Sequence, residues 1–190
     1  MYKRQPLEVF VDLLKKHEIH VVADVRSQPR SKYTPHFDAP ELKVTLPAQG
    51  IRYIFMGKEI GGRPEGREFY DEEGRVRYDL LAGSARFLEG ISRLERGIGQ
   101  HRLALKCGEE DPAGCHRRLL IGRVLAERGV AVCHIRGDGR LQTERELAEE
   151  EEGNTRDPAQ LPLFDMPEEK AWRSIRSVSP REQRPPSSEP

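Results

Sequence analysis

The sequence predicts an α/β fold: a three-layer, Rossmann-like parallel sheet of about four strands with flanking helices, followed by a disordered C-terminal tail. Two observations predict it. Over residues 1–136, short apolar runs alternate with segments of helical periodicity, which is the pattern of a parallel sheet with right-handed crossovers. From 137 to 190 the alternation stops and acidic, then Pro-, Ser- and Arg-rich sequence follows. We therefore expect one folded domain at 1–136 and a tail at 137–190 that buries too little apolar surface to fold.

Four strands and four helices are expected within the domain. The strands are the β-branched or apolar runs 19–25, 52–56, 102–107 and 130–135. The helices are expected at 6–17, 38–49, 80–97 and 112–128, and the first of them has apolar residues at the i, i+3, i+4, i+7 spacing of one helix face. The stretch 57–79 is glycine-rich, charged and longer than an ordinary connection, which is typical of loops that are either functional or flexible.

Charge is distributed unevenly along the chain. Residues 1–136 carry 24 Lys+Arg and 19 Asp+Glu, whereas 137–190 carry 8 and 13, so a body of net charge +5 precedes a tail of −5. A basic body with an acidic tail is compatible with a nucleic-acid partner. A charge of +5 on a body of this size is equally compatible with an ordinary surface, and the sequence leaves both interpretations open.

The composition argues against a membrane or secreted protein. No apolar run approaches the length that spans a bilayer, and the first six residues lack the apolar block of a signal peptide. The three cysteines are an odd number and are not spaced like those of a small disulfide scaffold. We therefore expect reduced thiols in a cytoplasmic protein, with no membrane partner.

Chemically informative side chains follow the ends of three predicted strands. In an open parallel sheet, ligands bind outside the carboxyl ends of the strands, so we expect the three loops to meet in one cleft. An Asp-Pro pair at 111–112 marks the start of the helix that enters this cleft. The residues concerned are Asp24, Arg26, Arg30 and His36 after the first strand, Gly61, Gly62 and Arg63 after the second, and Cys107, Glu109, Cys115, His116 and Arg117 after the third.

The basic residues of this set would suit an anion such as phosphate. Guanidinium groups near a helix start bind phosphate well, and a glycine pair lets the backbone approach a ligand closely. Asp24 and Arg26, two residues apart, would point to the same side of their strand. They could orient a substrate or a histidine, or form a buried structural ion pair, and the sequence does not decide between the two. The expected ligand-binding residues are Arg26, Arg30, His36, Gly61, Gly62, Arg63 and Arg117.

Two cysteines are candidates for a reactive thiolate. Cys107 follows a strand, as the nucleophile of cysteine phosphatases and rhodanese-type enzymes does. The acidic loop 108–111 behind it would repel an oxyanion, and its spacing to Arg117 is longer than the C-x5-R of those enzymes. Cys115 is the preferred thiolate, because a first-turn position and the arginines that follow lower a thiol's pKa. The alternative is that Cys115 is a small buried residue on the inner face of its helix.

A metal site is not expected. Cys107, Cys115 and His116 are soft ligands, and Asp111 or His36 could supply a fourth. The C-x2-C pairs of structural zinc sites are missing, however, and the adjacent Cys115 and His116 should point in different directions on a helix. The sequence indicates no particular cofactor.

Three stretches together resemble the signatures of the DUF488 family, whose function is unknown. They are D-V-R-S-Q-P-R-S at 24–31, G-G-R at 61–63, and C-G-E-E-D-P-A-G-C-H-R at 107–117, and the resemblance covers roughly residues 7–136. It implies a small α/β domain with a functional cleft, but no known reaction. Members usually begin with a strand reading like T-I-G-H-S, whereas this chain begins almost at the first helix. Two explanations stay open: the strand is lost, or the start codon is misassigned. Without that strand, a central strand that the resemblance implies is missing.

A second resemblance lies in the tail. Residues 160–164, Q-L-P-L-F, are similar to the peptide with which bacterial proteins bind the sliding clamp, Q-L-[SD]-L-F, with Pro162 as the departure. An apolar anchor in a disordered segment can reach a pocket on a partner. The alternative is that these apolar residues pack on their own domain. The expected contacts are Gln160, Leu161, Leu163 and Phe164.

The residues lead to three hypotheses of different classes. The first is an enzyme or ligand-binding domain for a phosphate-containing ligand, a nucleotide or nucleic acid, in which Cys115 or His116 acts with Asp24 or Glu109 in attack or proton transfer. The second is a non-catalytic replication or repair accessory protein tethered to the sliding clamp. The third is a small structural domain whose Cys-His-Arg turn only fixes a helix to the sheet.

Overall fold

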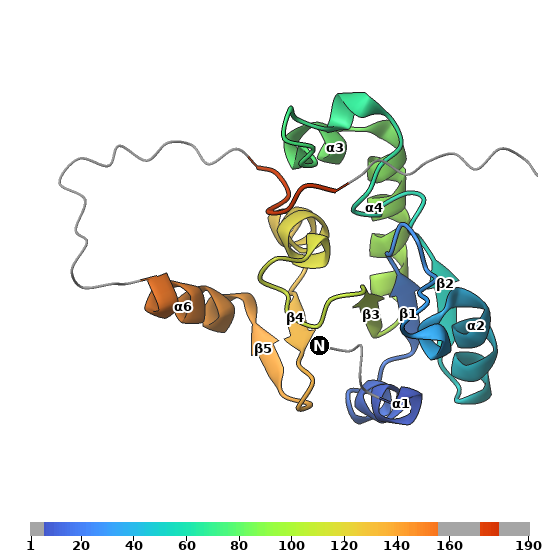
Figure 1. Cartoon of the computed structure of the whole chain (residues 1–190). Coiled ribbons are helices and arrows are strands. Elements are labelled where there is room, and N and C mark those ends of the chain that lie inside the picture. Colours follow the sequence, from blue (N-terminus) through green and yellow to red (C-terminus); the bar gives the residue numbers. More distant parts are fainter. Residues whose placement is uncertain (1–5, 156–171, 179–190) are drawn as a thin grey trace, which may run out of the picture.

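The computed structural model of the chain describes residues 6–155 and 172–178. At its centre is a three-stranded parallel sheet of β1 (Val21–Asp24), β2 (Arg52–Phe55) and β3 (Leu103–Lys106), in the order β2-β1-β3 (Figure 1). All four residues of the central strand β1 are buried, as expected for a strand covered on both faces. The predicted α/β class with a parallel sheet is therefore confirmed.

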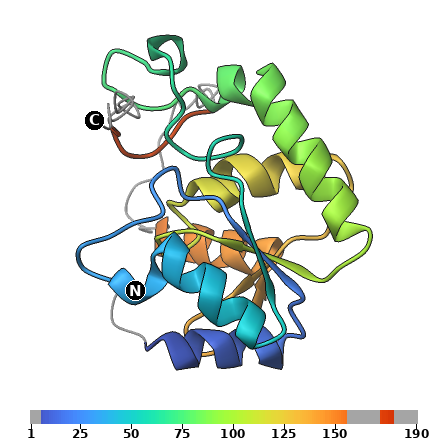
Figure 2. The same ribbon diagram turned by 90° about the vertical axis from the view of Figure 1, so that its right-hand side faces the viewer.

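Helices cover both faces of the sheet (Figure 2). On one face α1 (Leu7–Lys16) and α2 (Ala39–Ala48) share an apolar cluster with Val22 of β1. On the other face α4 (Ala85–Ile98) and α5 (Arg123–Glu127) share a second cluster with the next residue, Ala23. Successive side chains of a strand point to opposite faces, so one strand contributes to both clusters and the domain has three layers.

Shorter elements complete the domain. The predicted helix 112–128 starts later than expected, after a turn at 112–115, and then runs without a break from His116 to Glu127, as a π-helical stretch Arg117–Gly122 followed by α5. A short helix α3 (Tyr78–Ala82) precedes α4, and two 3-10 turns lie at Pro35–Phe37 and Arg67–Phe69. Within 6–155 and 172–178, no helix has the length and apolar character needed to cross a bilayer.

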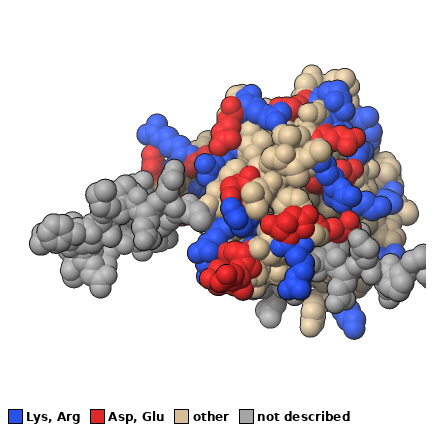
Figure 3. Space-filling model, turned by 90° about the horizontal axis from the view of Figure 1, so that it is seen from above, with Lys and Arg blue, Asp and Glu red and all other residues tan. Residues whose placement is uncertain are grey.

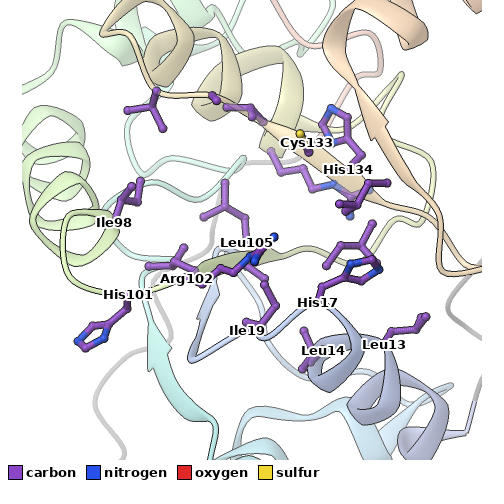
Figure 4. Close-up of a pocket in the computed structure, with 18 of the residues that line it drawn as sticks. Leu13, Leu14, His17, Ile19, Ile98, His101, Arg102, Leu105, Cys133 and His134 are labelled. Carbon is purple, nitrogen blue, oxygen red and sulfur yellow. The ribbon is translucent and has the colours of Figure 1, made fainter.

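The fourth predicted strand does not join the parallel sheet. β4 (Cys133–Ile135) pairs antiparallel with β5 (Leu141–Thr143) across a tight turn in which Gly139 has φ 82°. Among the described residues, β4 and β3 are separated by an apolar cavity of about 440 Å³ that α1 also lines (Figure 4). In residues 6–155 and 172–178 the strands form a parallel sheet of three and an antiparallel pair, so the expected single sheet of about four strands is not confirmed. An Asp-Gly turn at 138–139 gives β4 a local hairpin partner, and this signal was missed.

Two segments of the expected tail have a defined structure. Helix α6 (Glu144–Thr155) follows β5 directly, buries Leu147, and is bound to the domain by Arg118, which pairs with Glu144 at 2.7 Å and with Glu151 at 2.8 Å. Residues 172–178, called the C-terminal segment below, pack on the domain through Trp172. The average composition of the tail predicts disorder, and it does not reveal single residues, such as Trp172, that attach a segment to the domain.

The C-terminal segment lies along the loop that follows β2. The amide of Ser174 donates to the carbonyl of Val76 at 2.8 Å, and the indole Nε1 of Trp172 donates to the carbonyl of Leu119 at 2.7 Å. The Trp172 ring also lies edge-on to Tyr78 and beneath the guanidinium of Arg123, 4.4 Å from its Cζ. The expected clamp-binding residues Gln160, Leu161, Leu163 and Phe164 lie outside the described residues.

Candidate functional site

A polar cleft of about 380 Å³ opens at the carboxyl edge of the parallel sheet. Loops that follow all three strands line it, as the strand order predicts. A further wall, the C-terminal segment, was not foreseen. The lining residues include Arg26, Ser27 and Gln28 after β1, Gly62 and Arg63 after β2, Cys107, Gly108, Glu109 and His116 after β3, and Ser174, Ile175 and Arg176 of the C-terminal segment.

Asp24 and Arg26 form a buried ion pair at the end of β1. The Asp24 side chain is fully buried; Arg26 Nε donates to its Oδ1 at 2.8 Å, and Arg26 NH2 donates to its Oδ2. The hydroxyl of Tyr53, on the neighbouring strand β2, donates to the same carboxylate at 2.8 Å. Burial disfavours the charged guanidinium, but the carboxylate outweighs this and raises the pKa of Arg26. Asp24 therefore positions Arg26 and has no direct access to the cleft.

Cys107, Cys115 and His116, called the Cys–His cluster below, lie together beside the cleft. Sγ of Cys107 is 3.6 Å from Nδ1 of His116, and the two sulfur atoms and a His116 ring nitrogen all lie within 4.8 Å of one another. The other ring nitrogen of His116, Nε2, is 3.1 Å from the carbonyl oxygen of Val25. A carbonyl only accepts, so Nε2 carries a hydrogen and Nδ1 faces Cys107.

The thiols of the Cys–His cluster differ in acidity. A hydrogen bond from Cys115 and the charge of His116 hold the pKa of Cys107 well below its usual range. The same contact, together with burial, raises the pKa of Cys115. Burial works against protonated His116, but the thiolate of Cys107 outweighs it and raises the His116 pKa. Cys115, the thiolate preferred from the sequence, is buried and does not line the cleft, whereas Cys107 does.

The glycine pair is required for close packing around this cluster. A Cβ on Gly62 would lie 2.6 Å from Cγ of His116, and a Cβ on Gly61 would lie 2.4 Å from Oγ of Ser27. That hydroxyl oxygen accepts a hydrogen bond from the amide of Arg63 at 2.9 Å, which fixes the loop after β2 against β1. The absence of side chains at Gly61 and Gly62 thus lets this loop pack closely against Ser27 and His116.

The acidic loop after Cys107 does not present all its charge to the cleft. Glu110 and Asp111 each lie 3.3 Å from the guanidinium of Arg136, so both carboxylates are paired on the side of β4. Only Glu109 lines the cleft, and burial followed by the charge of Cys107 raises its pKa. The sequence predicted that the whole loop would repel an oxyanion. In the structure only one of its carboxylates, that of Glu109, lines the cleft.

Residues 6–124 match the family model described as domain of unknown function DUF488. The chain belongs to the DUF488 family. No similar curated protein and no similar solved structure was found.

Four expected ligand-binding residues of this DUF488 domain do not line the cleft, and one of them, Gly61, packs against Ser27 instead. Arg117 is buried and donates to the backbone carbonyls of Glu109 and Glu110, so it braces the loop from behind. Arg30 is exposed on the loop after β1, and His36 stacks against Phe37 with its ring centroid 4.6 Å away. That a residue follows a strand in the sequence does not show whether its side chain points into the cleft, because a long loop can turn it away.

Sequence reasoning missed two residues that line the DUF488 cleft, Ser27 and Arg176, and two that lie close to its groups, Tyr53 and Lys106. Tyr53 donates a hydrogen bond to Asp24, and Ser27 accepts one from the amide of Arg63. Arg176 lines the cleft from the C-terminal segment. Lys106 is buried at the end of β3, and burial, followed by the charge of Arg26, lowers its pKa to about 8. A lysine at the end of an apolar strand was the available signal for this last group.

Proposed function

We propose that the cleft binds a small phosphate-containing ligand of the nucleotide class. The observation that carries this proposal is the pair Arg63 and Arg176. They come from segments far apart in the chain, line the same cleft, and neither forms an ion pair with another described residue. The charge of Glu109, on the same cleft, does interact with Arg176, but the two groups form no ion pair. Two arginines on one cleft with no ion-pair partner suit a ligand with several anionic oxygens, because guanidinium groups bind phosphate in a two-pronged manner.

Arg26 adds a directed donor to this arrangement. Asp24 balances its charge and fixes its orientation, while its NH2 group also donates to the carbonyl of Phe37 at 2.8 Å. Its NH1 group makes no hydrogen bond with another described residue, and the side chain lines the cleft. A guanidinium held in this way loses little side-chain entropy when it binds a ligand.

The size of the cleft and the surrounding surface favour a single nucleotide over a long nucleic acid. A volume of about 380 Å³ falls within the range of small-molecule sites. Seen from above, the molecule presents basic and acidic side chains interspersed on this face (Figure 3). Binding to a nucleic-acid backbone depends on many neutralised phosphates, which needs a continuous basic surface.

Chemistry on the bound ligand would take place where the Cys–His cluster borders the cleft. Cys107, Glu109 and His116 line it, so they are the groups within reach of a ligand. Asp24 and Cys115 lie behind them, and they would act by positioning Arg26 and Cys107. The proposed roles of Cys115 and Asp24 are therefore supporting roles.

Calorimetric titration tests the binding proposal. Each ribonucleoside 5′-monophosphate is compared with its own nucleoside, and the nucleotide is expected to bind at least about tenfold more tightly, a difference of about 1.4 kcal/mol. Arg63→Ala and Arg176→Ala should each reduce the affinity for the nucleotide by a similar factor. Arg145→Ala, on the exposed face of α6, is the control and should bind as the wild type does. Equal affinity for nucleotide and nucleoside would exclude the proposal.

A second proposal concerns the tail: residues 160–164 tether the protein to a bacterial sliding clamp. It is supported by the resemblance of Gln160, Leu161, Leu163 and Phe164 to clamp-binding peptides. The described residues on both sides, α6 and the C-terminal segment, pack on the domain, so the motif would be offered between two attached points. Deleting 160–164 should abolish co-purification with the clamp while the melting temperature is unchanged, and binding that survives the deletion would refute the tether.

A further inference from the structure

The Cys–His cluster has the composition and spacing of a metal site. Its two thiols and one imidazole are the ligands that zinc prefers. With Zn–S of about 2.3 Å and Zn–N of about 2.1 Å at a tetrahedral angle, sulfur and nitrogen lie about 3.6 Å apart. The separation of Cys107 Sγ and His116 Nδ1 is 3.6 Å, and Cys115 Sγ lies within 4.8 Å of Cys107 Sγ and of a His116 ring nitrogen.

The surroundings of these atoms are those of metal ligands. The Nε2–H of His116 donates to the carbonyl of Val25, which leaves the Nδ1 lone pair for a metal; such a second hydrogen bond accompanies nearly all metal-bound histidines.

The backbone explains why neighbouring Cys115 and His116 can bind one ion. Both residues precede the π-helical stretch: the Cys115 amide donates to the carbonyl of Pro112 at 3.1 Å in a turn, and His116 is the residue before Arg117. Their side chains are therefore not spread around a regular helix. The sequence argument against a metal assumed that they were.

We propose that Cys107, Cys115 and His116 bind one Zn²⁺ ion, with the fourth ligand position open to the cleft. Cys107 and His116 line the same cleft as Arg63 and Arg176, whereas Cys115 is buried and does not line it, so the open ligand position would lie on the cleft side. Three protein ligands and one open position are the arrangement of catalytic rather than structural zinc sites. The orientation toward a nucleotide deepens the proposed function, whereas zinc binding itself does not depend on it.

Metal analysis of the full-length chain tests the site. Protein produced in zinc-supplemented medium and purified without chelator is expected to contain close to one zinc per chain by mass spectrometry. Cys107→Ser, Cys115→Ser and His116→Asn should each lose most of it. Cys133→Ser, at the exposed cysteine of β4, is the matched control and should retain full zinc content. Wild-type protein without zinc, or with zinc that all three variants retain, would overturn the proposal.

A second measurement keeps the test independent of folding in the variants. Wild-type protein reconstituted with Co²⁺ should show a sulfur-to-cobalt charge-transfer band and the visible bands of a tetrahedral site. A protein that shows no such bands, or that holds a Cys107–Cys115 disulfide or a free Cys107–His116 thiolate pair under the same conditions, would contradict zinc ligation. Nucleotide binding is measured separately, so a metal-free protein that still binds nucleotide defeats only this inference.

Discussion

The guanidinium of Arg26 binds both carboxylate oxygens of Asp24, and that carboxylate is fully buried at the end of the central strand. Of the two roles that the sequence left open for this pair, the geometry supports a buried ion pair that also aims Arg26 at the cleft. Removing one partner leaves the other charge buried and uncompensated, which is far more costly than losing an exposed pair.

Asp24→Asn should therefore lower the free energy of unfolding by about 3–5 kcal/mol, measured by urea denaturation. Asp79→Asn is the control, because Asp79 pairs with Arg77 at 2.7 Å where both side chains are about half exposed. The control should change stability by no more than about 1 kcal/mol. Similar losses in both variants would show that the Asp24 pair is not buried as described.

Gly62→Ala should displace His116, since the new Cβ would lie 2.6 Å from its Cγ. We expect a loss of about 1–3 kcal/mol in stability from overpacking, together with reduced zinc content. Gly83→Ala provides the comparison, because the nearest atom to its Cβ is 3.7 Å away. If Gly62→Ala behaves like Gly83→Ala in both measurements, the contact between the glycine pair and His116 is absent.

Trp172→Ala should detach the C-terminal segment from the domain. The indole loses its hydrogen bond to Leu119 and its contacts with Tyr78 and Arg123, and removal of a packed tryptophan costs about 3 kcal/mol or more. Nucleotide affinity should fall as well, because Arg176 belongs to the same segment. Ile175→Ala, at a side chain 58 % exposed, controls for stability and should have little effect on thermal unfolding. A Trp172→Ala protein with unchanged affinity would place Arg176 outside the binding site.

His134 should make the protein less stable in acid. It is buried against Glu144, with Nε2 2.6 Å from Oε1, and burial outweighs this carboxylate and lowers the His134 pKa below 6.5. The folded protein then binds a proton less readily than the unfolded chain, so this contribution to stability is present above pH 6.5 and is lost as the pH falls below it.

Melting temperatures of the wild type and of His134→Gln, compared between about pH 7.5 and about pH 5, check this. The wild type should lose more of its melting temperature across that interval than the variant does. Parallel curves for the two proteins would mean that His134 titrates alike in the folded and unfolded states.

The parts of the site that sequence reasoning found are those fixed by local pattern. Alternating strands and helices imply that Arg26, Arg63 and Cys107 meet at one edge of a sheet, and they do. Contacts that depend on how a loop turns in space were not accessible. The pairing of Glu110 with Arg136 relieves the acidity of the loop after Cys107, and the turn at Cys115 brings its sulfur to His116. Both reverse conclusions drawn from charge and helical spacing.

Long-range partners were also beyond the sequence. β4 pairs with the strand that follows it rather than with β3, and the C-terminal segment supplies Arg176 to the cleft from beyond α6. The pairing of β4 depends on a competition between β3 and β5 as its neighbouring strand. The position of Arg176 depends on a few anchoring contacts, chiefly those of Trp172, within a stretch whose average composition predicts disorder.

The central claim, that the cleft at the carboxyl edge of the sheet binds a nucleotide, is tested most directly by amide chemical-shift mapping. A nucleoside 5′-monophosphate is titrated into the isotope-labelled full-length protein. We predict that the largest shifts occur at the amides of Ser27, Gly62, Arg63, Gly108 and Gly114, which line the cleft. Shifts confined to other surfaces, such as α6 or the β4–β5 hairpin, or no shifts at saturating nucleotide, would contradict the account.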